Sequence, residues 1–317
     1  MKLFKITFVL VSLITLSLAS CSKDLSEINE NPNNVNETHP QLLLTEICYG
    51  AFTVDGTSNM YASRMLVQTD GENSSQYYNW NRGSFGEYGN LRNITKMYEE
   101  AERIESDAYI ALAKFFRAYY FYRLTLTFGD IPYSEALGGE MNSIYTPKYD
   151  SQKQVFQGIL SELNEANALL ANSTELIAGD IIFNGDAVKW QKLVNSFRLK
   201  VLITLSKKES DSDFNIASSF ASIYNNEPIM TSLEDNAQIV FIDQDGSRYS
   251  QFNSSGYGSG MYMDSTFIKR LQDHRDPRLF LYSGTTKNAK EAGLADDNFD
   301  AYEGGNPIAP YGEVNDK

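Results

Sequence analysis

The sequence predicts a mainly α-helical fold, and the stretch from Ser106 to Leu137 is the clearest indication of it. Apolar residues recur there at the spacing of one helix face, namely Ala108, Leu112, Phe115, Tyr119, Tyr122 and Leu126. Residues 119–122 are aromatic nearly all round, which predicts burial on more than one side. Asp107 is the predicted N-cap, and Gly129 followed by Pro132 would end the helix. We therefore expect this helix at the centre of an all-α core.

Further helices follow from the same spacing and from end signals. Pro40 suits a first helical turn, and Ser151 and Asp186 are suitable N-caps. Trp190 lies on the apolar stripe of the helix after Asp186, so we expect it in the core. The predicted ranges are Pro40–Val54, Ser58–Gln68, Asn90–Glu105, helices beginning after Ser151 and after Asp186, Phe214–Tyr224 and Met263–Asp273.

Three ordered motifs resemble a known family. The central helix reads KFFRAYYFYRL from Lys114 and runs into FGDIPY; residues 184–207 read NGDAVKWQKLVNSFRLKVLITLSK; a third motif is DPRL at 276–279. Together they resemble the SusD/RagB family, outer-membrane lipoproteins of Bacteroidetes-type bacteria that capture nutrients, mostly glycans. The resemblance implies a tetratricopeptide-like superhelix of antiparallel helix pairs with long, aromatic-rich binding loops. No strict repeat is visible in the sequence, so the superhelix rests on the resemblance alone.

Residues 1–20 have the pattern of a bacterial export signal. Lys2 and Lys5 make a positive start, and the apolar run Ile6–Leu18 is short for a membrane span. The segment ends in the lipobox LASC, so we expect cleavage before Cys21 and a diacylglyceryl lipid on its thiol, enough for stable anchoring. An ordinary signal peptide followed by a chance cysteine is the alternative.

The organisation that we expect has three parts: a signal peptide over 1–20, a lipidated polar tether over 21–39, and a helical substrate-binding domain over 40–317. Members of the family are usually longer, and the last residues lack a capping or hydrophobic closing element. We therefore expect the chain to be a fragment lacking a C-terminal part.

Charge and cysteine content narrow the function classes. The net charge is −14, and removal of residues 1–20 takes away two basic residues and no acidic ones, which gives −16. Such a surface is a poor partner for nucleic acid. The only cysteine besides Cys21 is Cys48, in an apolar stretch, so we expect a core residue and no internal disulfide.

Catalysis has little support in the sequence. The only histidines, His39 and His274, are far apart, and the usual nucleophile, phosphate-loop and metal motifs are absent. Residues 243–246 (DQDG) resemble part of a calcium loop without its later acidic ligand, which favours a turn. Arg117, Arg123 and Arg198 stand among apolar residues and predict ion pairing. We expect no enzyme activity, no metal and no cofactor beyond the lipid.

Two loop segments have the composition of a sugar site, because sugars bind flat aromatic platforms edged by hydrogen-bonding groups. The candidates in the first segment are Tyr77, Tyr78, Asn79, Trp80, Asn81 and Arg82. Those in the second, which extends over 243–262, are Arg248, Tyr249, Asn253 and Tyr257. In sugar-binding members of the family that the chain resembles, the first loop contributes an aromatic and an amide. The alternative is that the tyrosines only fix the loops to the body.

The resemblance also implies a role. We expect a surface-exposed outer-membrane lipoprotein that holds an oligosaccharide and closes as a lid over a SusC-like TonB-dependent transporter barrel. Two alternatives remain open: a peptide nutrient of the kind that RagB binds, and a structural lid with little affinity of its own.

Overall fold

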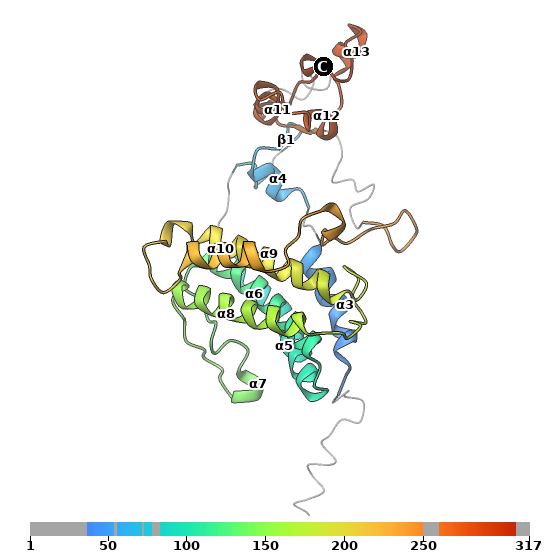
Figure 1. Cartoon of the computed structure of the whole chain (residues 1–317). Coiled ribbons are helices and arrows are strands. Elements are labelled where there is room, and N and C mark those ends of the chain that lie inside the picture. The colour runs from blue at the N-terminus through green and yellow to red at the C-terminus, as the bar shows by residue number, and fades with distance from the viewer. Residues whose placement is uncertain (1–36, 54–55, 72, 78–82, 250–259, 309–317) are drawn as a thin grey trace, which may run out of the picture.

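The computed structural model describes residues 37–53, 56–71, 73–77, 83–249 and 260–308. A helical body and a smaller lobe make up the described part of the chain (Figure 1). The body contains α3 (Pro40–Phe52), α5 (Glu87–Arg103), α6 (Asp107–Phe128), α7 (Gly139–Asn142), α8 (Gln152–Ala171), α9 (Ala187–Thr204), η1 (Ser206–Lys208), α10 (Ile216–Asn226) and η2 (Leu233–Asp235). The lobe contains α4 (Ser58–Ala62), β1 (Leu66–Gln68), β2 (Met261–Met263), α11 (Ser265–Asp273), α12 (Leu279–Tyr282), α13 (Lys287–Glu291) and η4 (Phe299–Ala301).

Helix α6 is the central helix of the body, as its sequence predicts. It packs against both α5 and α8, and buried side chains occur on all its sides. The predicted N-cap is wrong by one residue: the Ser106 hydroxyl, not Asp107, accepts the backbone N–H of Tyr109. At the other end Gly129 has φ +77°, a conformation that glycine adopts without a Cβ penalty.

The long helices stack in chain order. α3 packs on α5, α5 on α6, α6 on α8, α8 on α9, and α9 on α10. Ser151 begins α8 with a reciprocal capping box to Gln154, and Asp186 accepts the N–H groups of Val188 and Lys189 at the start of α9, as predicted. The short connection between α5 and α6 favours antiparallel packing of these two helices. The mainly α-helical class is confirmed.

Trp190 lies at the centre of the body core. It is 0% exposed, and its indole N–H donates to Asp180 at 2.9 Å. Rings from α3, from α6 and from the segment before α9 approach it at T-shaped angles: Phe52, Phe115, Phe116 and Phe183. The buried Asp180 also accepts three backbone N–H groups of the segment before α9, so the tryptophan and the turn share one acceptor. The predicted core role of Trp190 is confirmed.

The smaller lobe has its own hydrophobic cluster, formed by Ile268, Leu271, Leu279, Ala289, Ala301 and Tyr302. Asp264, 0% exposed, caps α11 by accepting from Thr266 N–H and forms an ion pair with Arg64 at 3.1 Å. This pair ties the segment after α4 to the start of α11. The lobe therefore joins residues from both ends of the described chain.

Two predicted helix boundaries are wrong in this lobe. The helix predicted over Ser58–Gln68 stops at Ala62, and Arg64 has φ +60°, which ends it. Leu66–Gln68 instead forms β1, whose partner β2 includes the Met263 predicted to begin a helix. Local apolar spacing cannot distinguish so short a strand from a helical turn, because its partner lies far away in the sequence.

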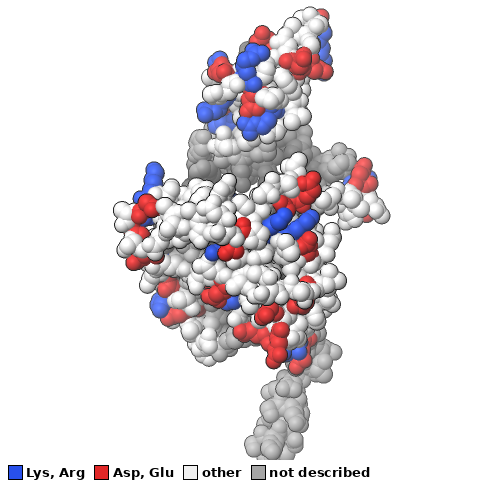
Figure 2. Space-filling view, viewed as in Figure 1, with Lys and Arg blue, Asp and Glu red and all other residues white. Residues whose placement is uncertain are grey.

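Several charged groups on the body form ion pairs. Arg117 binds Glu162 at 2.8 Å, and Arg123 binds Glu87 at 2.7 Å, which confirms ion pairing for these two arginines. On the face shown in Figure 2, acidic and basic side chains are interspersed over the helical body. No helix in the described part of the chain is long and apolar enough to cross a membrane.

Candidate ligand-binding site

The two segments predicted to bind ligand leave the fold at the same place. β1 and β2 pair antiparallel, with Gln68 opposite Met261, and Thr69 N–H donates to Gly260 O at 2.8 Å. Because the strands are antiparallel, the loop that follows β1 starts at the end of the ladder at which the loop that precedes β2 finishes. The fold thus brings together the bases of two loops that are far apart in the sequence.

Gly260 allows this close approach. Its φ is +84°, and a Cβ there would lie 2.4 Å from the Asp70 Cβ and 2.8 Å from the Asp70 N. Real Cβ contacts are not that short, so any side chain at 260 would push the two segments apart. The glycine immediately before β2 therefore has a structural reason.

Gln76 fixes the first loop immediately before Tyr77. Its side chain is 1% exposed and pairs twice with the backbone of Gln68: Oε1 accepts Gln68 N–H at 2.7 Å, and Nε2 donates to Gln68 O at 3.3 Å. The Asn73 side chain accepts Ser75 N–H and Gln76 N–H and closes the intervening turn. Tyr77 follows this anchor and is 49% exposed, as a stacking platform requires.

The other end of the first loop rests on the end of α6. Phe85 stacks on Phe128 with centroids 4.3 Å apart and ring planes at 11°, and a Cβ at Gly83 would meet the same ring at 2.6 Å. Phe85 thus packs one ring face on the end of α6. Five candidate residues between these anchors lie outside the described residues: Tyr78, Asn79, Trp80, Asn81 and Arg82.

The second segment begins with a turn that includes its first candidate residue, Arg248. Arg248 binds Asp243 at 2.5 Å across the turn, and Ile242 N–H donates to Ser247 O, so the DQDG segment forms the expected turn. Tyr249 meets Phe241 in a T-shaped contact with centroids 5.2 Å apart. The other two candidates, Asn253 and Tyr257, lie outside the described residues.

A cavity beside β2 was not predicted. Its volume is about 430 Å³, and its lining includes Tyr262, Tyr282, Lys287 and Glu303. Tyr282 is about half exposed. Gly304, also in the lining, lies so close to the Ser265 backbone that a Cβ there would be 2.5 Å from it. Tyrosines beside charged groups suit a hydroxylated ligand. Tyr262 belongs to the aromatic-rich second segment, but nothing in the sequence indicated that α12 and α13 would complete a cavity with it.

The described residues contain no group of three or more His, Cys, Asp or Glu side chains that could hold a metal. His39 precedes α3 and accepts Gln41 N–H, whereas His274 follows α11; both are exposed. Cys48 is fully buried, and burial raises the pKa of its thiol well above the usual value, so the thiolate is disfavoured. Its predicted core role is confirmed.

Comparison with known proteins supports one family. A model of the family described as starch-binding and associating with the outer membrane matches residues 32–311. A SusD homologue from Bacteroides fragilis is 56% identical with a TM-score of 0.80 over 89% of this chain and 60% of its own. An outer-membrane protein of Bacteroides vulgatus linked to nutrient binding is 49% identical, with a TM-score of 0.79 over 88% of this chain and 61% of its own.

A second SusD homologue from Bacteroides fragilis is 31% identical, with a TM-score of 0.77 over 87% of this chain and 59% of its own. No curated protein sequence matches the chain. The chain spans about 60% of the length of these solved relatives. The match over residues 32–311 and the identity to the solved homologues agree with the three sequence motifs, and the chain belongs to the SusD-like family of outer-membrane nutrient-binding proteins.

Proposed function

We propose that this protein captures oligosaccharides at the cell surface and delivers them to a partner TonB-dependent transporter of the SusC type. The observation that carries the proposal is the common base of the two aromatic-rich loops at one end of the β1–β2 ladder, with the half-exposed Tyr77 beside it. Family membership gives the general class, nutrient binding at the outer membrane.

Capture needs no bond to be made or broken. Aromatic faces from the two loops stack on the apolar faces of sugar rings, and the neighbouring amides and Arg82 and Arg248 hydrogen-bond the ring hydroxyls. Each contact is weak, but several along one extended ligand raise the effective concentration of the next. In this proposal the protein is a binding protein, not an enzyme, and it uses no metal or cofactor.

A lipid on Cys21 would hold the protein at the membrane. The polar segment over 21–39 would act as a tether between that lipid and α3 and would let the body close over a transporter barrel. Release of the sugar into the barrel then completes delivery.

The test is binding of purified protein from Ser22 onward to a panel of plant, fungal and host glycans, by affinity electrophoresis and calorimetry. Trp80→Ala should weaken binding of the recognised glycan about tenfold or more, the loss expected for one aromatic platform. Tyr145→Ala is the matched control, because Tyr145 is an 80% exposed aromatic on the helical body. Both variants must keep the parent's thermal unfolding.

Failure of the folded protein to bind any glycan would contradict the proposal. Binding of peptides instead would establish the peptide alternative. Binding of neither, with retention of the transporter in a membrane pull-down, would establish the passive lid.

A further inference from the structure

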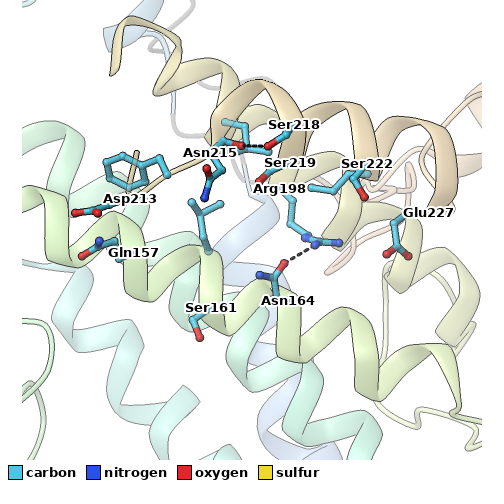
Figure 3. Close-up of a pocket in the computed structure, with 14 residues that line it drawn as sticks. Gln157, Ser161, Asn164, Arg198, Asp213, Asn215, Ser218, Ser219, Ser222 and Glu227 are labelled. Carbon is cyan, nitrogen blue, oxygen red and sulfur yellow. Dashed lines mark hydrogen bonds between the residues drawn. The ribbon is translucent and has the colours of Figure 1, made fainter. Parts of the chain in front are cut away.

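A polar groove crosses the helical body away from the β1–β2 ladder. It lies between α8 and α10, with α9 behind it, and has a volume of about 740 Å³ (Figure 3). Sites for small ligands have volumes of about 300–1,000 Å³. The groove is therefore large enough for two or three sugar rings.

Both walls of this groove are mainly polar. α8 contributes Gln157, Ser161 and Asn164 beside the apolar Leu160, and α10 contributes Ser218, Ser219 and Ser222 beside the apolar Ile223. Gln157, Ser161 and Asn164 follow one another at four- and three-residue steps, and Ser222 lies four and three residues after Ser218 and Ser219, so each polar set lies on one helix face. Helices that simply pack together place apolar residues at such facing positions. A missing apolar helix would be a poor occupant here, and a hydroxylated ligand a good one.

The floor combines apolar surface with a buried cation. Leu202 and Phe214 are buried, and Arg198 is only 9% exposed. The Arg198 guanidinium donates from Nη1 to Asn195 Oδ1 at 2.7 Å and from Nη2 to Asn164 Oδ1, and its Nε has no hydrogen-bond partner among the described residues. Because its partners are amides, the ion pair predicted for Arg198 is wrong in the described part of the chain.

The charges at the groove nearly balance. Asp213 at one end binds Lys153 at 2.7 Å, so its charge is compensated. Glu227 at the other end accepts from Asn167 and offsets the charge of Arg198. The lining thus offers hydroxyls, amides, one guanidinium and two carboxylates without a large net charge. This combination suits a neutral ligand with many hydroxyls better than an anion or a cation.

We propose that this groove is a second ligand site, which binds a neutral oligosaccharide of two or three units along the polar faces of α8 and α10. This groove is separate from the loop site proposed above, and none of its described lining residues belongs to the anchors of that site. The proposal therefore does not require that the loops bind sugar.

Site-specific protection of an introduced thiol tests this proposal. Ser222→Cys places a thiol in the groove, whereas Ala221→Cys places one on the exposed neighbouring position of α10, outside the lining. Each is made in protein from Ser22 onward, in which the remaining Cys48 is fully buried. The rate of alkylation by iodoacetamide is measured with maltotriose, cellotriose or diacetylchitobiose, and with digalacturonate and glycylglycine as charged comparisons.

A neutral sugar should slow alkylation of S222C about tenfold at roughly nine times its Kd, because only the unoccupied fraction reacts. The A221C rate should not change, and protection should persist in a W80A background, which separates this groove from the loop site. Protection of S222C by none of the neutral sugars, equal protection of A221C, or protection by the charged ligands alone would each overturn the proposal.

Discussion

Gly260 is a residue at which the segments after β1 and before β2 approach closely. A side chain there meets both an unfavourable positive φ and the backbone of Asp70, whereas at Gly246 the φ is also positive (+79°) but no atom lies within 4 Å of an added Cβ. Substitution at Gly246 therefore measures the cost of the backbone conformation alone, whereas substitution at Gly260 measures that cost together with the cost of a steric clash.

We expect Gly260→Ala to destabilise the ladder by about 1–3 kcal/mol more than Gly246→Ala, the cost of overpacking a close contact. Hydrogen exchange of the Thr69 and Asp264 amides measures this locally, since both donate to backbone carbonyls at the ladder. Equal protection of these amides in the two variants would show that the close approach of 70 and 260 does not hold the loops together.

Glu100 is a buried carboxylate that fastens the segment before α3 to α5. It binds Arg103 at 2.8 Å and Lys96 at 3.0 Å, and it accepts Thr38 N–H at 3.2 Å. The hydrogen bonds from Arg103 and then Lys96 lower the pKa of Glu100 to about 2. A carboxyl whose folded pKa is lowered stabilises the fold above its unfolded pKa, about 4.5, and loses that contribution as pH falls through its folded value.

The predicted result is that Glu100→Gln lowers the free energy of unfolding at pH 7 and that its difference from the parent shrinks between about pH 5 and pH 2. Urea unfolding across this range measures it, with the exposed Glu46→Gln as a control for the change in net charge. If the free energies of unfolding of the parent and of E100Q changed with pH in parallel, the lowered pKa of Glu100 would be contradicted.

At the scale of elements, β1 is stabilised from both edges. β2 pairs with one edge, and the Gln76 side chain takes the place of a strand at Gln68 on the other. This arrangement holds the first loop in position although the strand has only three residues.

Removal of the Gln76 side chain, which fixes the first loop to β1, should weaken ligand binding without unfolding the body. Gln76→Ala removes the two hydrogen bonds between the Gln76 side chain and the Gln68 backbone, at a cost of about 1–3 kcal/mol, and this cost falls on the loop because neither bond involves a body helix. Glycan affinity and exchange of the Gln68 amide should both report the loss, with the exposed Gln238→Ala as the control. Unchanged affinity in Q76A would mean that the loop position does not matter for binding.

The long helices could be predicted because their signals are local. α6, α8 and α9 carry apolar spacing and end signals within their own sequences, and their boundaries follow to within a residue or two. Strand β1 could not be predicted from its own sequence, because residues 66–68 are stabilised by residues 261–263 and by the Gln76 side chain.

The same limit applies to the sites. Aromatic and amide composition predicted both loops as candidate sites, and the structure gives them a common base at the ladder. The parts played by Gln76, Gly260 and Tyr282 depend on contacts that exist only in the folded chain, so no local pattern marks them. Arg198 resembled Arg117 and Arg123 in sequence, yet α8 presents it with an asparagine instead of an acid.

In the molecule as a whole, the body and the smaller lobe have separate hydrophobic clusters, and the β1–β2 ladder lies in the lobe close to the body (Figure 1). The first loop is anchored to both: to β1 through Gln76 and to α6 through Phe85 and Phe128. A ligand at these loops would contact groups from the early and late parts of the chain and would favour one arrangement of the two parts.

The central claim is that the two loops form one glycan site. The most direct measurement is calorimetric titration of a recognised glycan into the parent, Trp80→Ala, Tyr257→Ala and Tyr145→Ala proteins. We expect W80A and Y257A each to lose about tenfold or more in affinity for that same glycan, and Y145A to bind as the parent does. Full retention of affinity in either loop variant, from a folded protein, would contradict a shared site.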